Sequence, residues 1–456
     1  MADPFARPLQ GHVHPSSVLS PRKAFARLAT LVRPMVRYEP HDPWELDTSR
    51  LPRLLAAHRR KLRAFAESWL APRALDIDVA PHAPPGKLHP ASREVLRAAG
   101  RAGHLSDLLP RPLGSLDPRL LRFPLAFPQA LKAEEFARVD GGLMLLLCAT
   151  GLGVAPALLA GNLGALRRTV IPAFRACERG EPHLFAFAIT EPAAGSDAEE
   201  SHGASLLRPG VVAKACQGGF RLTGRKCYIS GGDIAKHVVV FAALEGEGMD
   251  SWTAFLVPAG AEGFRVPRTE LKMGMRASGA AEIELDGVFV PERDVLGGLR
   301  AGWALNRAVL NVSRIPVAAM GVGFALAALE EATAFACRFR LGGKPLVDYQ
   351  DVQLTLAQMM AETNAARALV WQAAASPQAR QGEAAAAKFH TTDTARRVCE
   401  LAMDLLGNHA VLHEGRVEKV FRDARLTQIF EGTNQINRLA VIEEEQERLL
   451  GLLAGR

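Results

Sequence analysis

The 456-residue chain falls into three stretches that differ in how apolar and polar residues alternate. In the first stretch apolar residues recur at spacings of three and four, as in LPRLLAAHRRKLRAFAESWL at 51–70. That spacing places them on one face of a helix. Proline-rich segments at 80–90 and 123–128 interrupt the pattern and separate successive helices. The pattern therefore predicts a helical N-terminal domain over residues 47–183.

The second stretch, residues 184–300, consists of short β-rich runs that end at Gly, Pro or Asp. The runs are FAFAIT, GVVAKAC, GFRLTG, KCYIS, HVVVFAAL, TAFLVP, AEIEL and GVFVP. Such closely spaced runs favour a compact antiparallel barrel or sandwich over βαβ units. The third stretch, residues 301–456, returns to long Ala-rich segments with helical spacing, at 314–340, 350–375 and 383–407. We expect these segments to form a helical bundle.

One segment raises the question of a membrane span. Between Asp140 and Arg167 there is no charged residue, and this length could in principle cross a bilayer. Gly151, Gly153 and Pro156 divide it into short pieces, however. We therefore expect two buried helices joined by GLGVAP, and no membrane span.

The composition narrows the range of functions. Apolar residues make up 48% of the chain, enough to bury a large core. A net charge of +7 and a pI near 9.2 are only mildly basic. Basic residues are not interleaved with aromatic ones as in a nucleic-acid-reading surface, so no nucleic acid is expected as a partner. The excess of positive charge would suit a small ligand rich in phosphate.

The cysteines and the N-terminus indicate the compartment. The six cysteines, at 148, 177, 216, 227, 337 and 399, form no CxxC pair and no metal-ligand spacing. We interpret them as small buried apolar residues in a reducing compartment, without a metal. Residues 1–46 lack a secretory signal. Residues 4–38 contain several Arg and no Asp or Glu, which faintly resembles a transit peptide. A basic extension of a cytoplasmic protein is the favoured interpretation.

Two short motifs in the β-rich stretch carry candidate chemistry. FAITEPAAGSD, at 187–197, and KCYISGG, at 226–232, offer hydroxyl groups at Thr190, Ser196 and Ser230. Gly195 permits a close approach of the backbone to a flat or phosphorylated ligand. Tyr228 could lie along an aromatic ring system. Taken alone, the first motif favours an ordinary polar turn.

A third motif places one carboxylate among residues that would keep it dry. In RDARLTQIFEGTNQINR, at 422–438, Glu431 follows Ile429 and Phe430 and precedes Gly432. Apolar neighbours raise the proton affinity of a carboxylate by desolvation, and glycine lets a ligand approach the backbone. The pattern is typical of a general base rather than of a solvated surface Glu.

TEPAAGSD, KCYIS, KMGMRASGAAEIELDGVFVP and IFEGTNQINR, in this order, resemble the acyl-CoA dehydrogenase family. The resemblance runs from about Leu184 to the end and more weakly back to Asp47. It implies an α+β fold: a helical N-terminal domain, a middle β-barrel or sandwich and a C-terminal four-helix bundle, with FAD between the last two. It also implies an acyl-CoA or acyl-carrier-protein thioester as substrate, an electron-transfer flavoprotein as acceptor, and a homodimer or homotetramer acting in fatty-acid metabolism.

In this family a base removes the α-proton of an acyl thioester while the β-hydrogen leaves as hydride to the flavin, giving a trans-2-enoyl product. The resemblance implies that Glu431 is the base and that its backbone N–H helps to stabilise the thioester oxygen. It assigns FAD contacts to Phe187, Ile189, Thr190, Gly195, Ser196, Tyr228, Ile229, Ser230, Arg340, Gln350, Gly407, Thr433 and Gln435. It assigns substrate contacts to Ser196, Asn311, Arg314 and Gly432. Some members place the base just before that arginine, where this chain has Ser313.

The chain departs from the family pattern in two places. Phe339 stands where the family usually has an arginine that reaches the FAD diphosphate of a neighbouring subunit, and Arg338 and Arg340 are candidate substitutes. Asp404 would place a carboxylate near the cofactor phosphates. These changes keep open a non-catalytic relative without FAD. An acyl-CoA oxidase, or a flavin monooxygenase or nitroalkane-oxidase relative, is a further alternative, although resembling nitroalkane oxidases carry Asp at the position of Glu431.

Overall fold

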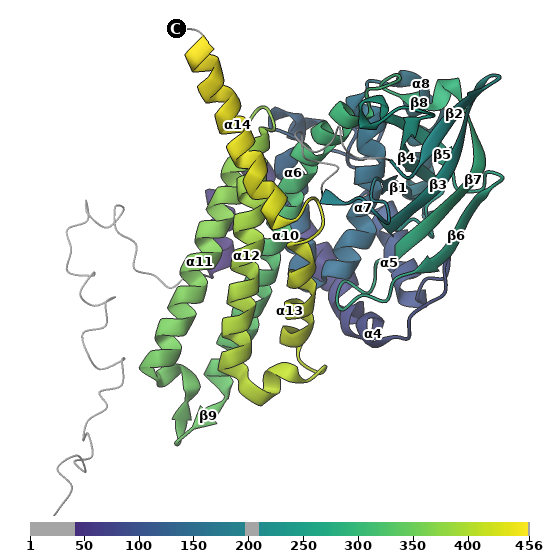
Figure 1. Ribbon diagram of the computed structural model, residues 1–456. Coiled ribbons are helices and arrows are strands. Elements are labelled where there is room, and N and C mark those ends of the chain that lie inside the picture. The colour runs from purple at the N-terminus through teal and green to yellow at the C-terminus, as the bar shows by residue number, and fades with distance from the viewer. Residues whose placement is uncertain (1–41, 197–208, 455–456) are drawn as a thin grey trace, which may run out of the picture. The chain divides into compact units, whose positions relative to one another are not determined.

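The computed structural model describes residues 42–196 and 209–454 (Figure 1). The chain divides into two compact units, Met1–Ala56 and Ala57–Arg456. In the first unit, helix α2 (Pro43–Arg50) is capped by the Asp42 side chain, which accepts a hydrogen bond from the Glu45 N–H at 3.0 Å. Most of the predicted N-terminal extension, residues 1–46, lies outside the described residues.

The second unit begins within helix α3 (Arg53–Phe65) and opens with a series of helices, as the apolar spacing predicts. They are α4 (Ala74–Val79), α5 (Pro90–Arg101), α6 (Ala126–Val139), α7 (Gly141–Leu159), α8 (Leu163–Ala165) and α9 (Ile171–Glu178). π-Helical turns at Ala66–Leu70 and Leu166–Val170 link neighbouring helices. Helix α6 is buried on almost every side. Such a helix belongs to the core rather than to the surface.

Helix α7 corrects the prediction of two helices joined by GLGVAP. It runs unbroken through Gly151, Gly153 and Pro156. Gly153 is a packing residue: a Cβ there would lie 2.7 Å from the backbone of Phe185 in the first strand. The glycine therefore lets helix and sheet approach closely, and it does not end the helix.

The β-rich stretch forms an eight-stranded sheet in the order β6-β7-β3-β2-β4-β5-β8, with β1 paired to β4. The strands are β1 (Phe185–Ala188), β2 (Val212–Cys216), β3 (Gly219–Ser230), β4 (His237–Leu244), β5 (Thr253–Pro258), β6 (Phe264–Thr269), β7 (Ala280–Pro291) and β8 (Val295–Leu296). Most neighbours are antiparallel, as predicted, but β1 and β2 both run parallel to β4. Strands β6 and β8 have no counterpart among the predicted runs.

Two pairs of predicted strands are each one long strand. GFRLTG and KCYIS are both part of β3, and AEIEL and GVFVP are both part of β7. Gly224 lies at a register shift in β3 with φ +140°, where a Cβ would meet the Gly210 carbonyl oxygen at 2.2 Å. The glycine thus marks a bulge inside a strand rather than the end of one.

The central strand β4 is buried on both faces, which explains its run of apolar residues. Val238, Val240 and Ala242 face the core that the strands enclose. Val239 and Phe241 face the other way, into a second core with residues of α7, α9 and α10. A strand covered on both faces loses the polar alternation of a half-exposed strand. This arrangement fixes the middle domain against the helices that carry the site.

The C-terminal part consists of five helices: α10 (Gly302–Arg338), α11 (Gln350–Ala375), α12 (Gln381–Leu406), α13 (Arg416–Thr427) and α14 (Asn434–Ala454). Helix α10 packs closely on α12 and on α6 through small residues. A Cβ at Gly321 would lie 2.8 Å from the Thr391 carbonyl oxygen, and one at Gly323 would lie 2.5 Å from that of Glu134. A short β9–β10 hairpin (Arg340–Leu341 and Lys344–Pro345) lies between α10 and α11, near the end of the bundle (Figure 1).

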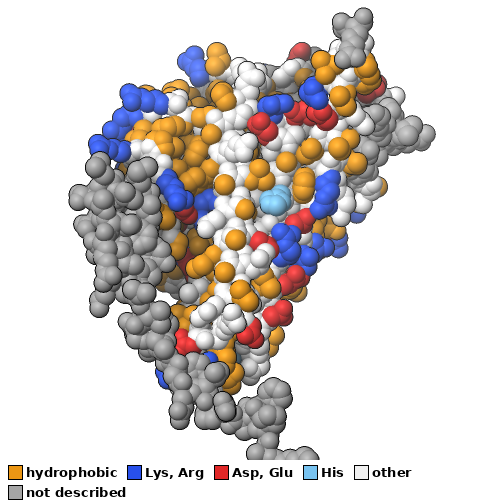
Figure 2. All heavy atoms as spheres, turned by 90° about the vertical axis from the view of Figure 1, so that its left-hand side faces the viewer, with side chains coloured by type: hydrophobic (Ala, Val, Ile, Leu, Met, Phe, Trp, Pro, Cys, Tyr) orange, Lys and Arg blue, Asp and Glu red, His pale blue; other side chains and the backbone are white. Residues whose placement is uncertain are grey.

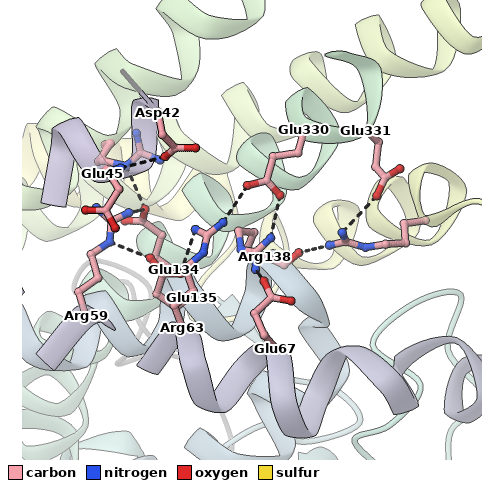
Figure 3. A network of polar contacts seen from close by, with 12 residues as sticks. Asp42, Glu45, Arg59, Arg63, Glu67, Glu134, Glu135, Arg138, Glu330 and Glu331 are labelled. Atoms are coloured by element: carbon pink, nitrogen blue, oxygen red, sulfur yellow. Dashed lines mark hydrogen bonds and ion pairs between the residues drawn. The ribbon is translucent and has the colours of Figure 1, made fainter. Parts of the chain in front are cut away.

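A network of charged side chains joins α3, α6, α10 and α11 within this unit (Figure 3). Glu134 accepts from Arg59 at 2.6 Å and from Arg367 at 2.9 Å. Arg138 pairs with Glu330 at 2.7 Å and also contacts Glu67. Burial alone would raise the pKa of Glu134, but the guanidinium groups of Arg367 and Arg59 hold it below its ordinary value. Removing one partner of such a buried set leaves an uncompensated charge.

Helices α7 and α10 are long and apolar enough to cross a membrane by length and composition. The relevant windows are 61% and 83% buried inside the fold, as in core helices of soluble proteins. On the face seen in Figure 2, acidic and basic side chains lie side by side along much of the surface.

The prediction that all cysteines are buried is wrong for Cys216 and Cys337, which are exposed.

Candidate active site

The predicted flavin motifs meet at one cavity of about 470 Å³ between the sheet and the C-terminal helices. Its lining includes the predicted residues Phe187, Ile189, Thr190, Gly195, Ser196, Tyr228, Ile229, Ser230, Glu431, Gly432 and Thr433. The Thr433 N–H donates to Ser196 Oγ at 3.1 Å, which joins the loop after β1 to the loop before α14. A cavity of this size, lined by apolar groups and a few convergent hydroxyls, is typical of a small-molecule site.

Backbone strain is concentrated at this cavity. Tyr228, Met275, Arg300 and Glu431 are the non-glycine residues with positive φ among the described residues, at +58°, +50°, +62° and +56°. All but Arg300 line the cavity. A left-handed backbone costs an L-residue about 1–3 kcal/mol and persists only where the surroundings enforce it. The strain is therefore consistent with a functional site. Tyr228 is also 64% exposed.

The loop that carries Glu431 is held by buried side chains. Lys388, on α12, is fully buried and donates to the Gly432 carbonyl oxygen at 2.6 Å. Asn437 donates to the same oxygen at 2.9 Å. Arg314, on α10, donates from Nε to the Glu431 carbonyl oxygen at 3.4 Å. Charged and amide donors thus fix the two consecutive carbonyl oxygens of Glu431 and Gly432. Within the described part of the chain, the Glu431 N–H has no hydrogen-bond acceptor.

Glu431 is half-buried at the cavity, and its carboxylate has a raised proton affinity. Burial raises its pKa above the ordinary 4.5, while the hydrogen bond from Ser313 and the charges of Arg314 and Lys388 oppose that rise. The Ser313 hydroxyl donates to Glu431 Oε2 at 2.8 Å. Burial outweighs the opposing groups because it penalises the charged form directly. The result is a carboxylate suited to act as a base near neutral pH.

Glu431 also lines a second cavity of about 210 Å³ between α7 and α10. Its wall is formed mainly by apolar side chains, among them Leu108, Met144, Leu145, Leu152, Val309, Val317, Met320 and Phe430. Gln129, Cys148 and Ser313 add the few neutral polar groups, and none of the lining residues is Lys or Arg. One carboxylate therefore lies on the boundary between a hydroxyl-lined cavity and an apolar one.

Several predicted residues do not reach either cavity. Gln435 is exposed on α14, and Asn311 lies one helical turn before Arg314 on α10. Arg340 donates to the Gly343 carbonyl oxygen within the β9–β10 hairpin at 2.7 Å. Gln350 and Gly407 lie at the start of α11 and the end of α12, respectively, and both are exposed. Their roles in cofactor binding stay predictions.

Sequence reasoning missed three residues of the site. Met275 lines the larger cavity, and its N–H donates to Asp423 Oδ1 at 2.5 Å. Lys272 lines the same cavity, and burial lowers its pKa to about 8. Lys388 holds the loop that carries Glu431. Only Lys388 gave a signal in the sequence, because it falls on the otherwise apolar face of an Ala-rich helix.

Comparisons with known proteins agree with this geometry. Family models for the acyl-CoA dehydrogenase middle domain and C-terminal domain match residues 186–288 and 300–445. The chain is 31% identical over 388 residues to an acyl-CoA dehydrogenase of Bacillus subtilis, which covers 84% of this chain and 95% of that protein. It is 29% identical over 391 residues to the caffeyl-CoA reductase-Etf complex subunit CarC of Acetobacterium woodii, covering 84% and 96%. The structure of butyryl-CoA dehydrogenase from Megasphaera elsdenii matches with a TM-score of 0.78 at 28% identity, over 87% of this chain and 99% of that one.

Fold and site together define a flavin-dependent oxidoreductase. The chain belongs to the acyl-CoA dehydrogenase family, and it is an enzyme that dehydrogenates acyl-CoA with FAD as its cofactor. The lining of the larger cavity fits the ring system of that cofactor. The exposed ring of Tyr228 offers a flat face to a planar ring system, and Thr190 and Ser230 offer hydroxyls to its polar edge.

Proposed function

We propose that the protein desaturates a neutral acyl thioester between the α and β carbons, with Glu431 as the base and a trans-2-enoyl thioester as product. The observation that carries this proposal is the position of the Glu431 carboxylate, which borders both the hydroxyl-lined cavity and the apolar one. A base in that position can reach the carbon between an acyl tail in one cavity and a redox cofactor in the other.

The residues of this chain divide the work as follows. Glu431 takes the α-proton on its carboxylate, and its backbone N–H lies free to stabilise the negative charge that develops on the thioester oxygen. Arg314 and Lys388 hold the loop so that neither group has to reorganise. Tyr228, Thr190, Ser196 and Ser230 would hold FAD. When bound, FAD supplies the acceptor for the hydride that leaves the β carbon.

The acyl group is proposed to be a neutral hydrocarbon chain. The apolar cavity has no cationic residue in its lining, so a chain ending in a carboxylate would lose its hydration without gaining a partner. Such an unpaired buried charge costs several kcal/mol, which corresponds to a loss of more than about a hundredfold in kcat/KM. A panel of hexanoyl-, octanoyl- and glutaryl-CoA, assayed by flavin reduction, measures this ratio. Equal rates for glutaryl- and hexanoyl-CoA would contradict the proposal.

The electron acceptor and the assembly are proposed from relatives. The relative from Acetobacterium woodii is named as a subunit of an Etf complex, and on that basis we propose an electron-transfer flavoprotein as acceptor here. We also propose a homodimer or homotetramer, because Arg340, Gln350 and Gly407 could meet FAD only from a second copy if they do not reach the cavity of their own chain. Light scattering of the purified holoenzyme tests the assembly, and a monomer would contradict it.

The decisive test of the base is the variant E431Q. The neutral amide keeps the size of the side chain but cannot accept the α-proton at neutral pH. We expect E431Q to bind FAD and remain yellow, while anaerobic flavin reduction by the best acyl-CoA falls by about 10²–10⁴-fold, the usual range for a lost general base. The exposed variant E445Q is the matched control and should reduce its flavin at the wild-type rate. An E431Q protein that reduces flavin as fast as the wild type would overturn the assignment.

A further inference from the structure

Ser313 is the side chain that contacts the carboxylate of the proposed base. It lies on α10 in the wall of the apolar cavity, and its Oγ donates to Glu431 Oε2 at 2.8 Å. The next residue, Arg314, donates to the Glu431 carbonyl oxygen at 3.4 Å. Two consecutive residues of one helix therefore hold the two ends of Glu431, the backbone and the carboxylate.

The Ser313 hydroxyl has a second acceptor within reach. Its Oγ lies 3.4 Å from the Leu310 carbonyl oxygen in the preceding turn of α10. A hydroxyl has one hydrogen to donate and two lone pairs that can accept. While Glu431 is charged, the hydrogen points to the carboxylate, the nearer and stronger acceptor. Once Glu431 carries a proton, its own O–H can donate to Ser313 Oγ, and the serine hydrogen can turn to Leu310.

We propose that Ser313 is a positioning residue, which holds the Glu431 carboxyl in one pose both before and after it takes the α-proton. This inference rests on the proposed role of Glu431 as the base. The hydroxyl can reverse the direction of its hydrogen bond without moving a heavy atom. The Glu431 carboxyl group then keeps its orientation between the two cavities throughout the reaction, so it does not have to reorient during proton transfer.

The charged groups around Glu431 allow the contribution of Ser313 to be separated from theirs. Arg314 on α10 and Lys388 on α12 both favour the charged carboxylate. Lys272, from the loop between β6 and β7, lines the larger cavity that Glu431 also borders. None of these cations is altered by a change at Ser313. S313A removes the hydrogen bond to Glu431 together with the longer contact to the Leu310 carbonyl oxygen, and alanine keeps the Cβ and the helix.

The test compares S313A, S313C and S313T in the full-length holoenzyme. Loss of a donor to the carboxylate destabilises its charged form, so the acid limb of the pH profile for flavin reduction should move upward in S313A by about one pH unit. At a pH below the limb the rate should therefore fall about tenfold, whereas the plateau at high pH should change less than about threefold. S313C, a weak donor, should show a smaller shift, and S313T should restore the wild-type limb.

A second readout needs no substrate. The infrared carboxyl band that is lost in E431Q reports the protonation of Glu431 directly, and it should titrate at a higher pH in S313A than in wild type. A uniform loss of rate with an unmoved limb and an unmoved band would overturn the inference and leave Ser313 a packing residue. If S313A does not fold, the pH profile of S313C and the infrared titration of the Glu431 carboxyl band in S313C test the inference instead. E431Q assayed in parallel separates the two claims: its full activity would refute the base, whereas its inactivity with an unmoved S313A limb would refute only the role of Ser313.

Discussion

The two ends of the predicted FAD site differ sharply in how far the chain builds them. At the flavin end, motifs separated by more than two hundred positions, such as those of Thr190 and Glu431, meet around one cavity and are fixed by buried donors. At the far end, Arg340, Gln350 and Gly407 are exposed, and Arg340 is engaged in its own hairpin. The Phe339 ring stacks on that of Phe335 with 4.9 Å between the ring centroids, and its centroid lies 5.7 Å from that of the His409 ring. The residues proposed for the chemistry thus line one cavity of a single chain, whereas Arg340, Gln350 and Gly407 are not among the residues that line it.

The buried charge network around Glu134, which lies away from both ends of the site, gives the largest expected effect. In E134Q the buried guanidinium groups of Arg59 and Arg367 lose their shared carboxylate, so the free energy of unfolding should fall by about 3–5 kcal/mol. Urea denaturation followed by tryptophan fluorescence measures this free energy of unfolding. E445Q, which removes an exposed pair with Arg448, is the control and should leave the urea midpoint unchanged. Equal midpoints for E134Q and E445Q would show that the network does not stabilise the fold.

The same carboxylate predicts a pH dependence. Glu134 has a pKa below its ordinary 4.5 in the folded protein, so its contribution to stability is fully present above that value. As the pH falls through 4.5 towards the folded pKa, the unfolded chain binds a proton first and the contribution is lost. Wild-type stability should therefore drop more steeply below pH 4.5 than that of E134Q. Parallel curves for the two proteins would contradict this.

The lysines of the two ends offer a sharper comparison. K388M removes the buried, charged donor to the Gly432 carbonyl oxygen, which Asn437 also contacts, and we expect the weaker hold on the loop to cost about 1–3 kcal/mol. We expect kcat/KM for flavin reduction to fall about 10–100-fold with FAD still bound. K344M, in the hairpin at the far end, should retain wild-type kinetics although it loses a contact with the Tyr349 ring. A larger loss of kcat/KM in K344M than in K388M would show that the far end of the site contributes more to catalysis than the flavin end, and would contradict this comparison.

The aromatic residues give the smallest expected difference. Y228A removes the exposed ring that lines the larger cavity, and loss of about 1 kcal/mol of ring contact should weaken FAD binding about fivefold. F339A, at the far end, should change the FAD dissociation constant less than about twofold. Equilibrium dialysis of the apoenzyme measures both values. Should F339A weaken FAD more than Y228A, the far end would carry more of the cofactor site than its exposure suggests.

The sequence predicted the elements wherever the pattern depended on local residues. The segment 350–375 coincides with α11 because its apolar spacing and lack of Pro or Gly determine a helix without outside help. The position of Glu431 beside apolar residues was predicted for the same reason, since its neighbours Phe430 and Gly432 lie next to it in the sequence, and its role as the base stays a prediction. Gly153 and Gly224 were wrongly interpreted as ends of elements. A glycine is needed at these positions because a side chain there would clash with Phe185 and Gly210, respectively. The left-handed backbone of Met275 and the role of Ser313 as a donor likewise depend on contacts with distant residues.

The most direct measurement of the central claim is a crystal structure of the protein with FAD and an unreactive thioether analogue of a medium-chain acyl-CoA. We predict that the acyl tail lies in the cavity between α7 and α10, with the Glu431 carboxylate within about 3–3.5 Å of the α carbon, the distance of a reactive pose. A tail bound elsewhere, or a Glu431 side chain turned away from the ligand, would contradict the account.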